Sequence, residues 1–218
     1  MSETNDLKEK YKEVSAAMLA DSLDAVGWRR QVLSAGICPL QSDVRILGRA
    51  ATVQFAPTEL DTDDPYGDII SFLDALSPGD VAIVATSGDL RAAYWGELFS
   101  AAAIHAGAVG VITDGCLRDT AKIQALGFAA FCSASRPIDY RARMRVVASN
   151  TPVTCGGVLI SPGDLVLADD DGVVVAPRSV ETEALALAVA RSKKERLLRD
   201  QLLAGNGLRT AWERFGVL

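Results

Sequence analysis

The chain has 218 residues, of which 49% are hydrophobic and 23% charged, and its formal net charge is -6. This length and balance predict a single domain with a full core. An acidic chain lacks the positive field that attracts phosphate backbones. Residues 1–14 contain no apolar segment of signal-peptide length, and no later stretch approaches the 18 apolar residues of a membrane span. We therefore expect a cytoplasmic protein, one domain over residues 1–218, that binds neither nucleic acid nor membrane.

Apolar residues at helical and strand spacing predict the elements of the first two thirds of the chain. In chain order they are one or two helices within about 6–27, broken near Ser15, then a strand at 44–57, a helix at 67–75, a strand at 79–85, a helix at 95–106, a strand at 108–113, a helix at 120–126 and a strand at 129–133. The order strand, helix, strand from residue 79 to residue 113 implies parallel strands. We therefore expect an α/β fold with its core over about 44–177.

After Pro137 the pattern changes to short strands between residues 146 and 175, separated by Gly and Pro pairs and by the acidic turn at 169–172. This half is predicted to be antiparallel and rich in hairpins. The last element is a helix over about 179–204, with Ser179 as its N-cap and Gly205 as its stop, followed by a tail. So long a helix exceeds the width of a small domain, so it either projects across a neighbouring subunit or lies along its own sheet.

Cysteine and histidine content limits the possible metal chemistry. The four cysteines form no CxxC pair, which indicates reduced and mostly buried thiols. His105 is the only histidine, so a site with several histidines from one subunit is excluded. It falls near the end of the predicted helix at 95–106, where an imidazole is favourable for structural reasons. The acidic turn at 169–172 lacks the spacing of a calcium loop and is interpreted as a solvated hairpin turn.

The candidate site lies in two loops that flank the predicted crossover. One loop contains Gly96, Glu97 and Leu98, whose amides open a helix and would favour a carboxylate. The other contains Arg118, which could clamp that carboxylate, and Asp119, whose hard oxygens suit Mg²⁺ or Mn²⁺. Ligands of open α/β sheets bind at this edge, beyond the carboxyl ends of the strands. The set could chelate a 2-keto acid; alternatively, Glu97 only complements the helix dipole.

The order Gly96-Glu97, then 20 residues, then Arg118-Asp119 resembles the metal-site signature of the family that contains 4-hydroxy-4-methyl-2-oxoglutarate aldolases and the RNase E regulator RraA. The resemblance covers roughly residues 15–205. It includes the strand near 44–53, the turn Val-Thr-Cys-Gly-Gly at 153–157, and the stretch from Pro162 to Pro177.

The resemblance implies a swivelling β/β/α fold, RraA-like, with a long C-terminal helix. It implies a homotrimer or homohexamer with active sites between subunits, a divalent metal (Mg or Mn) at Asp119, Arg118 on the keto acid, and Glu97 holding a catalytic water. A glutamate from the neighbouring subunit's C-terminal helix completes some sites of the family, and Glu195 is the best positional match. Lys122 stands where many of these aldolases carry an acidic residue, and it would either weaken metal binding or point into solvent.

The expected function is a divalent-metal-dependent class II aldolase that cleaves 4-hydroxy-4-methyl-2-oxoglutarate-type 2-keto acids to pyruvate. Oxaloacetate decarboxylation passes through the same enolate and is expected as well. A Schiff-base aldolase is disfavoured because Lys122 is the only lysine near the site. The alternative is a non-catalytic, RraA-like regulator that binds a ribonuclease. The long segment 179–218 favours the aldolase, because the shorter regulators largely lack such a helix and tail.

Overall fold

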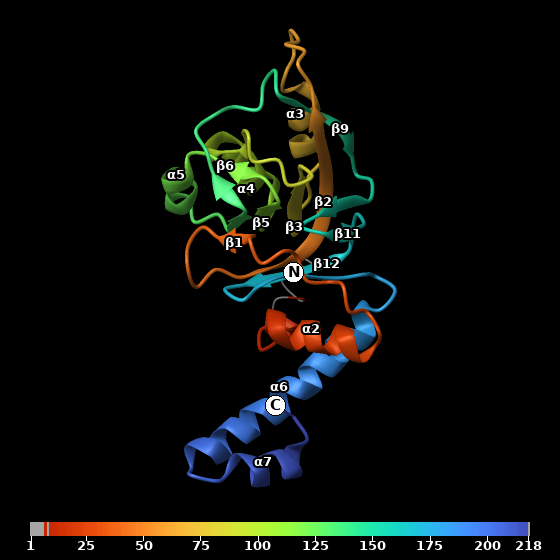
Figure 1. The fold of residues 1–218 in the computed structure, drawn as a ribbon, viewed down its shortest axis with the longest axis vertical. Coiled ribbons are helices and arrows are strands. Elements are labelled where there is room, and N and C mark those ends of the chain that lie inside the picture. The colour runs from red at the N-terminus through yellow and green to blue at the C-terminus, as the bar shows by residue number, and fades with distance from the viewer. Residues whose placement is uncertain (1–6, 8, 218) are drawn as a thin grey trace.

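The structure is a computed structural model, and it describes residue 7 and residues 9–217. The predicted start of the first helix at residue 6 and both ends of the predicted 1–218 domain lie outside the described residues. The centre of the fold is a mixed sheet in the order β1-β7-β5-β3-β2-β12-β13, with β9 also paired to β2 (Figure 1). Its strands are β1 (Cys38–Pro39), β2 (Ile46–Pro57), β3 (Asp80–Ala85), β5 (Gly110–Thr113), β7 (Ala130–Cys132), β9 (Met144–Ser149), β12 (Leu165–Asp169) and β13 (Gly172–Ala176).

Strand directions in this sheet agree with the sequence pattern. The neighbours β2, β3, β5 and β7 are parallel, as the predicted crossover requires. The chain beyond Pro137 is antiparallel: β12 pairs with β13 and with the first half of β2, and β9 pairs with the second half of β2. A separate hairpin of β10 (Val153–Cys155) and β11 (Val158–Ile160) packs its buried side chains against the main sheet. The long strand β2 therefore joins the parallel half of the sheet to the antiparallel half.

A second, smaller parallel sheet was not expected from the sequence. Its strands β4 (Ala93–Trp95), β6 (Cys116–Leu117) and β8 (Ala134–Ser135) follow β3, β5 and β7 along the chain. The three strands β3, β5 and β7 of the main sheet are thus each continued by a short strand of the second sheet. Strands of two or three residues are too short to show a period in the sequence, so they fell within predicted loops or helix starts.

Helices cover the main sheet in two groups. The first group, α3 (Gly67–Asp74), α4 (Glu97–Ala106) and α5 (Thr120–Ala125), shares a buried apolar cluster with β3 and β5. The second group consists of α2 (Ala16–Ala25) and the first turns of α6 (Glu181–Leu203), which pack with β12 and β13 in another cluster. Ser15 caps α2 through its side chain, which confirms the predicted break at this residue.

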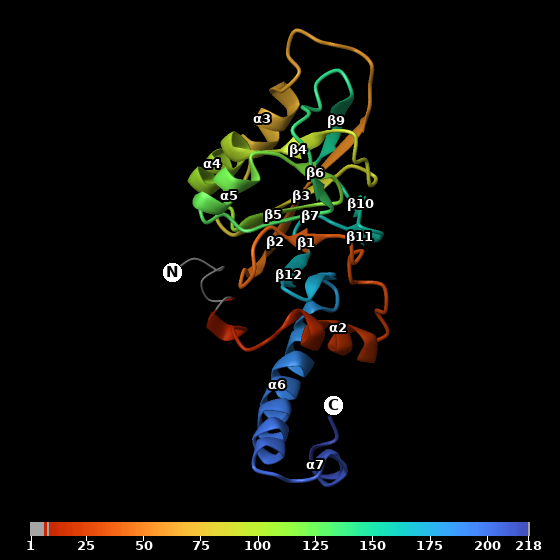
Figure 2. The same ribbon diagram turned by 60° about the vertical axis from the view of Figure 1, so that its left-hand side comes forward.

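The C-terminal part of α6 projects away from the sheets, and α7 (Leu208–Phe215) folds back beside it (Figure 2). The helix therefore does not lie along its own sheet, one of the two arrangements expected from its length. Four large apolar side chains of the described residues on this projection are exposed: Leu197, Leu203, Leu208 and Trp212. Gly205 ends α6 in a left-handed conformation, as predicted.

The prediction that Ser179 caps α6 was wrong. The N-cap is Val180, without a side-chain cap, because the carbonyl of Pro177 already accepts the amides of Val180 and Glu181 in a preceding turn. The acidic turn at 169–172, expected to be solvated, also makes a contact within the fold. Asp169 accepts the amide of Ala16 at 2.8 Å and so ties the start of α2 to the β12-β13 hairpin.

The remaining local expectations concern single residues. All four cysteines are free, with Cys38 exposed and the other three buried, as expected. His105 is exposed in the last turn of α4. No helix among the described residues has the length and apolarity needed to cross a bilayer.

Gly48 in β2 provides a test of this packing. A Cβ there would meet the carbonyl oxygen of Gly79 and, at 2.9 Å, the side chains of Val81 and Val109. Gly48→Ala should therefore lower the free energy of unfolding by about 2 kcal/mol. Gly36→Ala is the matched control, since its nearest neighbour would be 3.9 Å away. Urea unfolding followed by circular dichroism measures both variants, and equal stabilities would contradict the strand contact.

Candidate active site

A cavity of about 300 Å³ opens beyond the carboxyl ends of the second sheet. The strands β4 and β6 lead directly into it, and the turn after β8 closes one side. All five residues predicted to bind substrate or metal from one subunit line it. The lining consists of Tyr66, Ile70, Ala93, Tyr94, Trp95, Gly96, Glu97, Leu98, Phe99, Arg118, Asp119, Asp139 and Tyr140.

Close approach of two backbones forms the floor of this cavity. The amide of Arg118 donates to the carbonyl of Trp95 at 2.9 Å, which joins the loop after β6 to the loop after β4. A Cβ on Gly96 would lie 3.0 Å from Asp119 Oδ2 and 3.1 Å from Arg118 Cγ, so a larger residue would push these two side chains away from the start of α4. The Trp95 indole donates to Ser100 Oγ, which in turn donates to the Gly96 carbonyl. The start of α4 is therefore held rigidly.

The start of α4 supplies donors to the cavity. Gly96 is its N-cap and has no side chain to accept the first amides, and the helix is 10 residues long. The amides of Glu97 and Leu98 thus belong to the orphan donors of a helix N-terminus, which favour an anion.

Arg118 is oriented by two carboxylates. Its Nη1 lies 2.8 Å from Asp139 Oδ2, and its Nε lies 3.8 Å from Asp119 Oδ2. Its side chain is 39% exposed, so the guanidinium is accessible from the cavity. Asp139 was missed by sequence reasoning, because it lies in an irregular turn without a motif.

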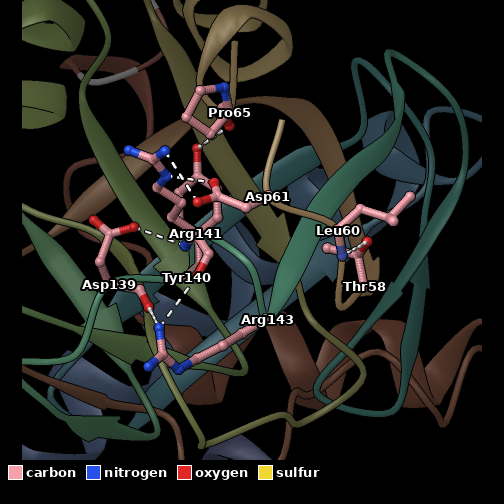
Figure 3. A network of polar contacts seen from close by, with 8 residues as sticks. All are labelled: Thr58, Leu60, Asp61, Pro65, Asp139, Tyr140, Arg141 and Arg143. Atoms are coloured by element: carbon pink, nitrogen blue, oxygen red, sulfur yellow. Dashed lines mark hydrogen bonds and ion pairs between the residues drawn. The ribbon is translucent and has the colours of Figure 1, made fainter. Parts of the chain in front are cut away.

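Figure 3 shows how the chain around Asp139 is fixed. Its second oxygen, Oδ1, accepts the amide of Arg141 at 2.7 Å, and the Arg143 side chain donates to its carbonyl. Arg141 forms a two-pronged ion pair with Asp61, and the Tyr140 hydroxyl donates to the carbonyl of Pro65 (Figure 3). These bonds join the 139–143 turn to the 58–66 loop. Burial raises the pKa of Tyr140, so this hydroxyl stays protonated at neutral pH.

Asp119 is in a left-handed conformation, with φ of 55°, directly before α5. Its side chain makes no capping bond to that helix and is 41% exposed. Apart from its 3.8 Å contact with Arg118, the carboxylate is thus available to a ligand in the cavity. The described residues contain no group of three histidines, cysteines or acidic residues placed to bind one metal ion. A single carboxylate fits an ion such as Mg²⁺ or Mn²⁺, which keeps several waters and completes its coordination with substrate oxygens.

Lys122 makes a contact that was not anticipated. Its Nζ lies 2.7 Å from Glu97 Oε2, although its side chain is 63% exposed. This hydrogen bond raises the pKa of Lys122, so the ammonium remains charged. Of the two alternatives for Lys122, the side chain is largely exposed to solvent, as one of them held, but its charged end contacts Glu97 at the start of α4.

Two further acidic residues, Asp114 and Glu195, lie outside the cavity. Asp114, in the loop after β5, is buried and accepts the amide and hydroxyl of Thr86 and the amide of Gly88, at 2.7 to 3.0 Å. It holds the loop rather than a ligand. Glu195 lies on α6, where it pairs with Arg191 at 2.6 Å, and it is absent from the lining within one chain. Its role in a neighbouring subunit's site stays a prediction.

Comparison with known proteins gives matches to one protein family. A family model described as RraA-like, Aldolase/RraA, matches residues 16–175. The chain is 31% identical, over 91% of each chain, to a Halalkalibacterium halodurans protein that bears the name 4-hydroxy-4-methyl-2-oxoglutarate aldolase provisionally. It is 26% identical to protein DlpA of Legionella pneumophila over 96% of its own length, and it spans 34% of DlpA.

A solved structure matches the fold closely. Streptomyces coelicolor RraAS2, described as an unusual member of the RNase ES inhibitor RraA protein family, matches with a TM-score of 0.83 and 31% identity. The match covers 90% of this chain and 98% of that one. It confirms the predicted fold.

The two aspartates of the β5-α5 segment can be distinguished by stability. Asp114→Asn should lower the free energy of unfolding by about 2 kcal/mol, because an amide nitrogen would face buried donors. Asp119→Asn should change it by less than about 0.5 kcal/mol, since asparagine tolerates the left-handed conformation and no bond to α5 is lost. Chemical denaturation measures both. A large destabilisation by Asp119→Asn would mean that its carboxylate holds the fold rather than a ligand.

Proposed function

The chain belongs to the RraA-like family, and from this premise we propose that it is a divalent-metal-dependent class II aldolase. Its proposed substrates are 2-keto acids of the 4-hydroxy-4-methyl-2-oxoglutarate type, which it cleaves to pyruvate, and it also decarboxylates oxaloacetate. The observation that carries the proposal is that Arg118, Asp119 and the N-terminus of α4 face the same cavity. That set offers a cation, a hard oxygen ligand and backbone donors to one small anion.

Charge in the cavity supports metal dependence. Three carboxylates line it, from Glu97, Asp119 and Asp139, against the single guanidinium of Arg118. Lys122 does not line the cavity, but its positive charge offsets the negative charge of Glu97. A 2-keto acid anion would still enter a site with excess negative charge, and a divalent cation at Asp119 removes that excess.

Substrate recognition then follows from the chain's own groups. The amides of Glu97 and Leu98 donate to the substrate carboxylate, and Arg118 donates to the same end of the molecule. Asp139 holds the guanidinium in place, so little reorganisation is needed when the ligand binds. Asp119 would hold the divalent ion, which supplies Lewis-acid polarisation of the keto group.

Proton transfer is assigned to Glu97. It orients a water that takes the proton of the C4 hydroxyl as the C3–C4 bond breaks and C4 leaves as a carbonyl, and the same water later returns a proton to C3 of the pyruvate enolate. Arg118 stabilises the negative charge that develops on that enolate. Glu195, from the α6 helix of a neighbouring subunit, is proposed to complete the water site in a homotrimer or homohexamer. The projection of α6, with Leu197, Leu203 and Trp212 exposed, supports such an assembly.

A second candidate function is a non-catalytic regulator that binds a ribonuclease. It is favoured by the likeness to RraAS2, which extends over 90% of this chain. The C-terminal helix therefore does not by itself separate the aldolase from the regulator. The composition of the cavity is the better criterion, since a protein that only binds a partner has no need of an accessible arginine and carboxylate in a 300 Å³ cavity.

Pyruvate release tests the proposed activity. Oxaloacetate and 4-hydroxy-4-methyl-2-oxoglutarate should both yield pyruvate with Mg²⁺ or Mn²⁺, and EDTA should abolish the reaction. Asp119→Ala should lower kcat/KM by about a hundredfold or more, because the metal loses its protein ligand. Turnover no faster than that of the free metal, on both substrates, would contradict the proposal and favour the regulator.

Lys122 gives a second test, specific to this chain. Lys122→Gln should tighten the apparent Kd for Mn²⁺ by about threefold, because it removes a positive charge near Asp119. The difference should shrink at high salt, as expected for an exposed charge. Lys12→Gln, which breaks another exposed lysine-glutamate pair, is the control. Weaker Mn²⁺ binding in Lys122→Gln would show that Lys122 supports the metal site instead of opposing it.

A further inference from the structure

A second cavity, of about 360 Å³, opens on the other side of Arg118 and Asp119. Those two residues line both cavities, so they form a shared wall rather than the end of the site. The other lining residues of the second cavity are Leu117, Thr120, Ser135, Arg136 and Pro137. The proposed reaction uses none of them.

Arg136 is the distinctive residue of the second cavity. Its amide donates to the carbonyl of Leu117 at 2.9 Å, which fixes its backbone to the end of β6. Its Nη1 donates to the carbonyl of Leu90 at 3.0 Å, so the side chain is anchored as well. No carboxylate of the described residues forms an ion pair with it, whereas Arg118 is paired with Asp139 and Asp119. A fixed guanidinium without a carboxylate partner is suited to bind an anion.

The two cavities differ in charge. The first has three carboxylates and one guanidinium, while the second has two guanidinium groups and only the carboxylate of Asp119. A substrate with two carboxylates carries one charge that the first cavity can bind with its metal and amides. The second charge is favoured where positive groups predominate. The hydroxyls of Thr120 and Ser135 add neutral donors there.

We propose that the second cavity binds the distal carboxylate of a dicarboxylic 2-keto acid, with Arg136 as the residue that determines this specificity. The keto acid end lies in the first cavity and the chain of the substrate passes over Arg118. This inference deepens the proposed function and rests on it for the position of the keto acid end. Both substrates of the proposed function carry a second carboxylate, and the inference assigns its recognition to Arg136.

Ligand binding tests the inference without requiring turnover. Titration calorimetry in Mg²⁺ compares 2-oxoglutarate with 2-oxopentanoate, which has the same carbon chain but lacks the distal carboxylate. Wild type should bind 2-oxoglutarate roughly tenfold or more tightly, as expected for a charge-assisted hydrogen bond. Arg136→Gln should remove this preference and leave the Kd for 2-oxopentanoate unchanged within about twofold.

Two further variants separate the possible outcomes. Arg136→Lys keeps the charge and should retain part of the preference, while Arg30→Gln, an exposed arginine outside both cavities, should retain all of it. Preference retained in Arg136→Gln, or absent from wild type, would overturn the inference. Lack of turnover with the binding preference intact would instead count against the aldolase alone, so the two failures are distinguishable.

Discussion

The hydrogen bond from the amide of Arg118 to the carbonyl of Trp95 joins the two loops on which the whole site depends. It forms because β4 and β6 run parallel as neighbours in the second sheet, with Trp95 opposite Leu117. The absence of a side chain at Gly96 then lets Asp119 and Arg118 approach the start of α4. A cation, a carboxylate and orphan amides are thereby brought together from segments more than 20 residues apart. Rigid strands behind them reduce the cost of organising these groups for a ligand.

Electrostatics explains why such a site suits an acidic ligand in an acidic protein. The net charge of -6 opposes any anion, and the first cavity adds an excess of carboxylates. A divalent ion at Asp119 and the guanidinium of Arg136 would offset this on either side of Arg118. Lys122, bonded to Glu97, adds a positive charge at the edge of the site. The proposed metal dependence and the proposed preference for dicarboxylates thus have the same physical origin.

The sequence predicts those parts of the fold that are long enough to show a period. The strands β2, β3 and β5 and the helices α4 and α6 could be placed within a few residues. The second sheet could not, because β6 and β8 have two residues each and carry no alternation. Ser179 has the residue type of an N-cap for α6, but in the structure the carbonyl of Pro177 accepts the amides of Val180 and Glu181.

Likewise, only some residues of the site could be predicted from the sequence. Glu97, Arg118 and Asp119 could be proposed because they form a spaced motif at loop positions. Asp139 and Arg136 could not, because they lie in an irregular turn after β8, and only the tertiary fold brings them to the cavities. The contact between Lys122 and Glu97 spans 25 residues and two helix ends, so no local rule predicts it.

In the proposed function, Asp119 and the start of α4 form one binding site for a metal ion and a keto acid. Titration of Mn²⁺ into the protein, followed by electron paramagnetic resonance with and without pyruvate, tests it most directly. We expect one Mn²⁺ per chain, bound more tightly when pyruvate is present, and loss of both effects in Asp119→Asn. Mn²⁺ binding that is insensitive to pyruvate, or that persists in Asp119→Asn, would contradict it.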